Sequence, residues 1–131
     1  ALGLLHDIGK IAIGDAVLNK VGPFSVAERQ EMETHAEIGY RILSTNHDMV
    51  EIADYVLAHH EHWDGKGYPK GLSGPQIPLP ARICAIADAY DAMTSPSHYQ
   101  PTRSAAAARA ELKRCAGSQF DPELVALFVG L

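Results

Sequence analysis

Two pairs of adjacent side chains that can bind metal ions lie far apart in this sequence. The first pair is His6-Asp7, and the second is His59-His60. Neutral imidazole and carboxylate together suit Mn, Fe or Zn. If folding brings the two pairs together, they can form a site for more than one metal ion. Such sites are typical of metal-dependent hydrolases.

The spacing of apolar residues predicts that the histidines face the interior. His59-His60 ends a predicted helix, and His59 follows the core-facing Val56 at a spacing of three residues. His35 shares a helical face with Ile38 in the same way. A buried imidazole is costly unless each ring nitrogen finds a partner. A single inward histidine is more often a hydrogen-bonded core residue than a ligand, but several together favour a metal site.

Two further residues extend the candidate site. Asp88 is next to Ala87 on a predicted core helix, so its carboxylate approaches the interior. Lys10 follows His6 by four residues and can face the same pocket. A lysine at the end of a helix is also favoured by the helix dipole alone. The metal ligands predicted from the residues are therefore His6, Asp7, His35, His59, His60 and Asp88.

Composition limits the class of protein. The chain has 131 residues, of which 47% are hydrophobic and 21% charged, as in an ordinary globular domain. Its net charge of -5 argues against binding to a nucleic-acid polymer through a basic face. Two cysteines without a CxxC pattern favour a reducing, cytoplasmic location. The absence of an apolar run of about 18 residues predicts no membrane contact.

The elements that must position these residues are helical. No strand-type alternation is sustained, so we predict one all-α, multi-helix domain over residues 1–131. The expected helices cover about residues 1–9, 26–34, 35–44, 48–60, 81–94, 105–115 and the segment after Asp121-Pro122. The expected caps are Ser25 with Glu28, Asp48 with Glu51, Ser104 and Asp121. The first residues are already apolar, so we expect a longer protein truncated at this end.

Residues 61–80 form a long Gly/Pro-rich loop. Glycines and prolines alternate there, which excludes a regular helix. A loop of about twenty residues in a compact domain is more often functional than connecting. The helix that follows is expected to face the core through Ile83, Ile86, Ala87 and Tyr90.

Four motifs resemble one family. They are HDIGK at 6–10, HHEHWDGKGYPKGLSG at 59–74, IPLPARICAIADAYDAMTS at 77–95 and QFDPELV at 119–125. Together they resemble the HD-GYP domain, a branch of the HD phosphohydrolase superfamily. The resemblance runs from Leu4 to the end of the chain and is highly specific, because the Gly67-Tyr68-Pro69 loop stands in its proper place.

The resemblance implies a bacterial phosphodiesterase that hydrolyses cyclic di-GMP to linear pGpG, GMP or both. Two or three divalent metal ions, Fe or Mn, are implied as cofactors. The six ligands predicted above match the family's positions, and Asp7 is implied to bridge two metals. Asp7 and Lys10 are the implied catalytic residues, Lys10 supporting the reacting phosphate or hydroxide. The implied substrate-binding residues are Lys10, Gly67, Tyr68, Pro69, Ser97 and Gln100.

The chain departs from the family pattern at one place. Ser97 and Gln100 stand where the family usually carries cations that meet substrate phosphate. This departure leaves a second interpretation, a catalytically weak or inactive regulatory module that binds nucleotide or a protein partner. A third is a hydrolase for another cyclic dinucleotide. An upstream sensory or receiver domain and a possible dimer are further expectations from the family.

Overall fold

The structure is a computed structural model that describes Asp7, residues 25–96 and residues 101–130. The predicted all-α fold is confirmed, because the described residues form helices and contain no strand beyond isolated bridges. The α-helices are α3 (Val26–Glu33), α4 (His35–Ser44), α5 (Val50–Ala58), α6 (Leu79–Thr94), α7 (Ala105–Arg114) and α8 (Pro122–Val129). Two short 3-10 turns, His47–Met49 and Gly74–Gln76, precede α5 and α6. No helix in the described part of the chain has the length and hydrophobicity needed to cross a bilayer.

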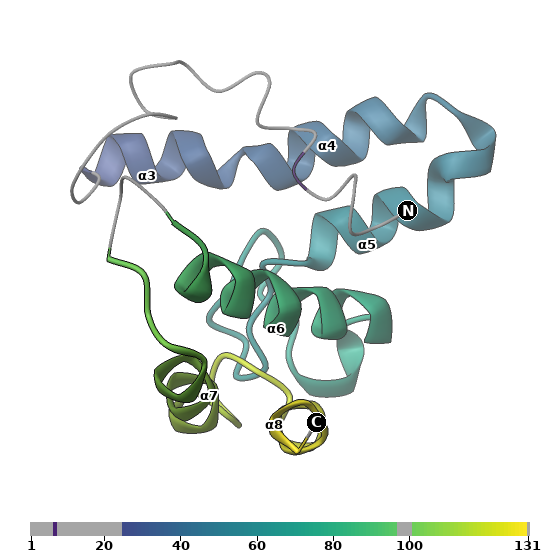
Figure 1. Cartoon of the computed structure of the whole chain (residues 1–131). Coiled ribbons are helices and arrows are strands. Elements are labelled where there is room, and N and C mark those ends of the chain that lie inside the picture. Colours follow the sequence, from purple (N-terminus) through teal and green to yellow (C-terminus); the bar gives the residue numbers. More distant parts are fainter. Residues whose placement is uncertain (1–6, 8–24, 97–100, 131) are drawn as a thin grey trace.

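Helices α4 and α5 form an antiparallel pair that decides where the histidines lie. Helix α3 continues almost in line into α4, and α5 turns back beneath α4 (Figure 1). Helix α6 crosses the middle of the molecule, with α7 and α8 packed below it (Figure 1). In an antiparallel pair, the first residue of α4 meets the end of α5. His35 and His59 occupy those two positions.

Three of the predicted caps are confirmed. The Ser25 hydroxyl accepts a hydrogen bond from the Glu28 N–H at 3.2 Å, and the Glu28 carboxylate accepts one from the Ser25 N–H at 3.0 Å. Ser104 accepts from the Ala107 N–H at 3.1 Å at the start of α7. Asp121 caps α8, which begins with Pro122. These side chains satisfy N–H groups that have no partner within the helix.

The boundaries predicted around α5 and α6 were partly wrong. Asp48 is not the cap of α5, because Asn46 caps the preceding 3-10 turn by accepting from the Asp48 N–H at 2.9 Å. Helix α5 then ends at Ala58, two residues earlier than predicted. Helix α6 begins at Leu79 rather than residue 81, with a proline in its first turn. Proline is tolerated there because the first N–H groups of a helix need no acceptor within it.

The hydrophobic core of the described residues has three parts. Leu43, Ala53 and Val56 are buried between α4 and α5. The larger part joins α6, α7 and α8, and its buried residues are Ile86, Met93, Ala108, Leu112, Cys115, Phe120 and Val125. A smaller cluster, of Ala58, Ile77 and Ala81, lies at the base of the loop.

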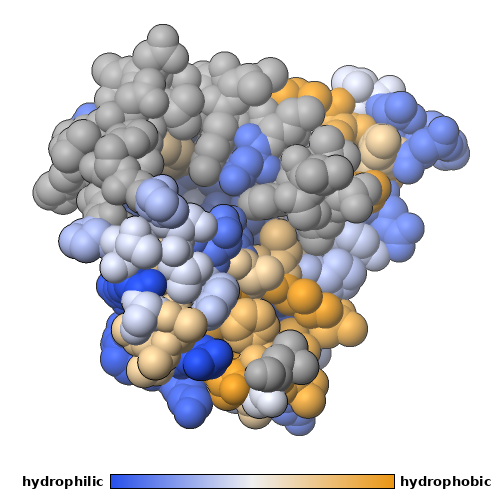
Figure 2. All heavy atoms as spheres, in the orientation of Figure 1, coloured by the Kyte–Doolittle hydropathy of each residue, from blue (hydrophilic) through white to orange (hydrophobic). Residues whose placement is uncertain are grey.

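The predicted core face of α6 was correct only in part. Ile86 is buried and Tyr90 packs against the core, but Ile83 is 51% exposed and Ala87 is also exposed. Figure 2 shows apolar side chains gathered on the outer surface over α6, where Leu79 is also exposed. Because α6 carries alanine or a larger apolar residue on most of its faces, the sequence pattern did not fix which face turns inward.

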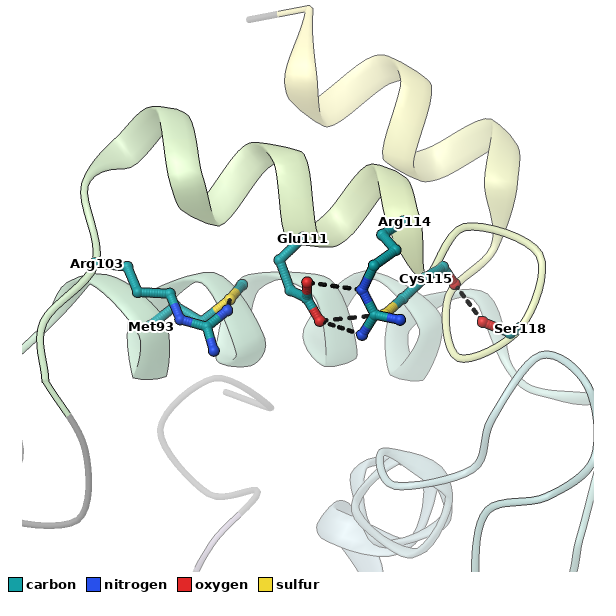
Figure 3. A network of polar contacts seen from close by, with 6 residues as sticks. All are labelled: Met93, Arg103, Glu111, Arg114, Cys115 and Ser118. Atoms are coloured by element: carbon teal, nitrogen blue, oxygen red, sulfur yellow. Dashed lines mark hydrogen bonds and ion pairs between the residues drawn. The ribbon is translucent and has the colours of Figure 1, made fainter.

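Polar contacts join α7 to the end of α6. The Arg103 N–H donates to the Met93 carbonyl oxygen at 2.7 Å, and the Arg103 guanidinium lies 3.5 Å from the Met93 sulfur (Figure 3). Further along α7, Arg114 donates to the Glu111 carboxylate at 2.8 Å (Figure 3). The second pair lies at the surface, where ion pairs contribute little to stability. The contacts of Arg103 with Met93 connect the residues just before α7 to the end of α6.

Arg82 forms an ion pair with Asp121 that connects α6 to α8. Its Nη1 donates to Asp121 Oδ2 at 2.7 Å, and its Nε donates to the Ile77 carbonyl at 2.9 Å. Asp121 is 5% exposed and its other oxygen accepts from the Glu123 N–H at 2.9 Å. The same carboxylate thus caps one helix and neutralises a cation on another.

Asp121→Ala is expected to lower the free energy of unfolding by about 2 kcal/mol, because it removes the α8 cap and leaves the half-buried Arg82 without its carboxylate. Urea unfolding followed by circular dichroism measures this change. Glu123→Ala, two residues further at an exposed position, is the control and should change the free energy by less than about 0.5 kcal/mol. Equal effects of the two substitutions would contradict the assignment.

Candidate metal centre

Two buried histidines present the same ring nitrogen to the site. His35 and His59 are each 1% exposed. Nδ1 of His35 lies 2.6 Å from the Met32 carbonyl oxygen, and Nδ1 of His59 lies 2.6 Å from the Val56 carbonyl oxygen. A carbonyl only accepts, so Nδ1 must carry the proton in both rings. In the neutral imidazole Nε2 then carries the lone pair, which is the arrangement of a metal-binding histidine.

Both Nε2 atoms approach one carboxylate oxygen. Asp7 Oδ1 lies 3.6 Å from Nε2 of His35 and 3.8 Å from Nε2 of His59. In the neutral rings all three atoms carry lone pairs, so they repel one another unless a cation lies between them. Ligand atoms of Asp7, His35, His59 and His60 all lie within 4.8 Å of one another. Ions that bind imidazole and carboxylate take ligands at about 2.0–2.2 Å, so these four residues fit a divalent metal after small adjustments.

His60 completes this cluster through ring contacts. Its ring centroid lies 4.0 Å from that of His59 and 4.7 Å from that of His35. Tyr68 is stacked on it at 5.1 Å, with 20° between the planes. Burial, and then the neighbouring rings of His59 and His35, lower the pKa of His60 to about 3. The ring is therefore neutral at physiological pH, and a neutral imidazole is the form that binds metal.

Asp88 lies beside the four-residue cluster rather than within it. It lines a cavity of about 150 Å³ together with His59, His60, His62 and Gln119. Its charge acts on His60 and raises the pKa of that ring, against the larger effect of burial. The role of Asp88 as a ligand stays a prediction.

The remaining predicted site residues divide into two groups. Gly67, Tyr68 and Pro69 lie in the described loop beside the cluster, with Tyr68 on His60 and a cis peptide bond between Tyr68 and Pro69. The others fall outside the described residues, so their predicted roles are untested: His6, Lys10, Ser97 and Gln100.

One residue of the site was missed in the sequence. Glu61 is 3% exposed, and its carboxylate accepts hydrogen bonds from three consecutive backbone N–H groups, those of Lys70, Gly71 and Leu72. A charged residue directly after two inward histidines was the available signal, because a buried carboxylate must find donors nearby.

Gly67 is required by close packing. A Cβ built on it would lie 2.3 Å from the His62 nitrogen and 2.5 Å from the His60 carbonyl oxygen. The loop therefore crosses directly over the backbone of residues 60–62. Only glycine fits at this crossing without a shift of the chain.

Known proteins share both the sequence and the fold. The HD domain family matches residues 1–124. The chain is 42% identical over 129 residues to a Thermotoga maritima protein named cyclic di-GMP phosphodiesterase. The matched region covers 97% of this chain and 35% of the relative. It is 40% identical over 127 residues to the 3'3'-cGAMP-specific phosphodiesterase 2 of Vibrio cholerae, covering 95% of this chain and 24% of that protein.

A solved structure has the same fold. The cyclic GMP-AMP-specific phosphodiesterase of Vibrio cholerae superposes with a TM-score of 0.69 at 23% identity, over 97% of this chain and 36% of that one. The chain thus spans about a quarter to a third of the length of these proteins. The motifs, the shared fold and the match over residues 1–124 lead to one conclusion: the chain belongs to the HD domain family.

Proposed function

We propose that this chain is the catalytic domain of a metal-dependent phosphodiesterase that hydrolyses cyclic di-GMP. The proposal rests on the position of the Asp7 carboxylate beside Nε2 of His35 and Nε2 of His59. The Nδ1 hydrogen bonds of both rings favour the tautomer in which Nε2 can bind metal. The names of the relatives support the reaction class, since they include phosphodiesterases for cyclic di-GMP and for 3'3'-cGAMP.

The proposed cofactors are two or three divalent ions, Fe or Mn, held by Asp7, His35, His59 and His60 with the predicted help of His6 and Asp88. Such ions, when bound, supply a nucleophile at neutral pH and neutralise charge on the phosphate oxygens. The protein's own part is orientation. The Met32 and Val56 carbonyls hold two rings, and Tyr68 covers the third.

The substrate side of the site is proposed to be the Gly67-Tyr68-Pro69 loop together with Lys10, Ser97 and Gln100. The phenol of Tyr68 stays neutral, because burial raises its pKa. A neutral phenol can donate a hydrogen bond to a phosphate oxygen. The proposed product is pGpG, GMP or both. The proposed setting is bacterial signalling in the cytoplasm, with an upstream sensory or receiver domain and a second copy of the chain as proposed partners.

A substrate panel tests the proposal. The purified full-length protein, loaded with Mn²⁺ or with Fe²⁺ under anaerobic conditions, would be incubated with cyclic di-GMP, 3'3'-cGAMP and cyclic di-AMP. We expect linear product from cyclic di-GMP at the highest kcat/KM. Turnover of 3'3'-cGAMP in preference would correct the substrate, and binding without turnover would favour the regulatory module.

Metal binding should also stabilise the fold. Mn²⁺ at about 100 times its Kd is expected to raise the free energy of unfolding by about 2.7 kcal/mol per site, and EDTA should reverse the effect. Thermal unfolding with and without metal measures it. A double variant, His35→Ala with His59→Ala, should unfold at the same temperature in metal and in EDTA. A metal-dependent rise that survives in this variant would place the ion elsewhere.

A further inference from the structure

We infer that Glu61 is a positioning residue of the metal centre: its buried carboxylate closes the loop over residues 61–72 and so holds Tyr68 against His60. The inference deepens the proposed function and rests on it for the role of His60 as a ligand. The structural part stands on contacts that do not require a bound metal.

The first step is the closure of the loop by Glu61. Oε1 accepts from the Gly71 N–H at 2.8 Å and the Leu72 N–H at 3.1 Å, while Oε2 accepts from the Lys70 N–H at 3.0 Å. Gly71 has φ +70°, so the three N–H groups turn toward one point. Successive N–H groups in such a turn form an anion-binding concavity. Here the anion belongs to the protein, ten residues earlier in the chain.

The second step is the path of the loop between these ends. It leaves after His60 and returns over it, so that Gly67 lies against the backbone of residues 60–62. The Tyr68 N–H then donates to the His60 carbonyl at 3.3 Å. This path places the Tyr68 ring face to face with the His60 ring.

The third step concerns how each ring is held. His35 and His59 each donate from Nδ1 to a backbone carbonyl of their own segment. For His60 the described contacts of the ring are with other rings, and Tyr68 covers one of its faces. Of these rings only Tyr68 comes from the loop, so the loop sets how that face of His60 is covered, and Glu61 closes the loop.

Glu61→Gln is the test, because it keeps the shape of the side chain. Glutamine retains one carbonyl oxygen for two N–H groups, but its NH2 group faces the third N–H and cannot accept from it. In the variant, hydrogen exchange of the amides of residues 70–72 should be at least about tenfold faster than in the wild type, while exchange in α7 should stay unchanged. Glu51→Gln is the matched control, since Glu51 is exposed and its hydrogen bond within the described residues is from the Tyr55 hydroxyl, at 2.7 Å.

The readout that separates positioning from a merely structural role is the His60 ring itself. In metal-free full-length protein with labelled histidines, NMR shifts of the His60 ring protons report the stacked Tyr68. Tyr68→Leu gives the shift of the unstacked ring. We expect Glu61→Gln to move the His60 signals at least halfway toward that value, while those of His35 and His59 stay unchanged.

Two results would overturn the inference. Faster exchange at residues 70–72 with an unchanged His60 signal would make Glu61 a loop residue only. Unchanged exchange would show that its carboxylate does not hold the loop. Glu61→Asp, which keeps the charge but withdraws it by one methylene, gives a milder perturbation with the same two readouts if Glu61→Gln does not fold. Neither readout requires turnover, so failure of the proposed reaction would be recognised separately.

Discussion

Asp7→Ala is expected to lower kcat for hydrolysis of cyclic di-GMP by at least about a thousandfold, equivalent to about 4 kcal/mol of transition-state stabilisation. The reason is the position of one oxygen. Asp7 Oδ1 lies 3.6 Å from Nε2 of His35 and 3.8 Å from Nε2 of His59. The same oxygen is therefore close to a proposed ligand atom from each of the two helices. Without it the four-residue cluster loses its carboxylate and keeps only the imidazoles of His35, His59 and His60. Single-turnover hydrolysis at saturating Mn²⁺ is the measurement.

Two companion variants make this result specific. Asp7→Asn keeps the shape of the side chain but not its charge, and it should lose most of the same activity. Asp54→Ala removes an exposed carboxylate from α5 and should leave kcat within about twofold, because surface substitutions away from the site have small effects. Near-normal turnover by Asp7→Ala, with its helical content intact, would refute the proposed centre.

Gly67→Ala is expected to lower the free energy of unfolding by about 3 kcal/mol, as overpacking in a crowded interior does. The added methyl group would meet backbone atoms at 2.3, 2.5 and 2.7 Å, and backbone cannot rotate away as a flexible side chain can. If the loop shifts instead, Tyr68 must leave the face of His60, and hydrolysis should fall at least tenfold. Urea unfolding and the hydrolysis assay together measure both outcomes.

A second glycine of the same loop provides the control. Gly74 has φ +54°, but a Cβ placed on it would meet nothing within 4 Å. Gly74→Ala should therefore lower the free energy of unfolding by only about 1 kcal/mol, the ordinary penalty of the left-handed conformation. Equal effects of Gly67→Ala and Gly74→Ala would show that the close approach of Gly67 to the backbone of residues 60–62 does not limit stability.

Local signals predicted the helices well where side chains act on their own backbone. Ser25 with Glu28, Ser104 and Asp121 cap their helices as expected, because a cap depends on residues only two or three apart. Asp48 failed as a cap since Asn46, two residues earlier, is an equally good acceptor. Nothing local distinguishes two candidates that lie only two residues apart.

Longer-range features were predicted less well. Ile83 was expected in the core but is exposed, because the burial of a helix with apolar residues on most faces is decided by its neighbours. The inward histidines were predicted correctly, since His35 and His59 continue faces already marked by apolar residues. The partners of Glu61 lie nine to eleven residues away in a loop without periodicity, so no pattern in the sequence pointed to them.

The antiparallel packing of α4 against α5 has a consequence for how the centre selects its ion. His35 begins α4 and donates from its ring to the Met32 carbonyl in α3, while His59 follows α5 and donates to the Val56 carbonyl in that helix. The spacing of the two Nε2 atoms that would hold an ion therefore depends on how α4 packs against α5. That packing is maintained by Leu43, Ala53 and Val56, none of which carries a polar side chain. Exchanging one of these aliphatic residues for a larger or smaller one would change the spacing of the proposed ligands, and with it the preferred size of the cation, while all the ligands stay in place.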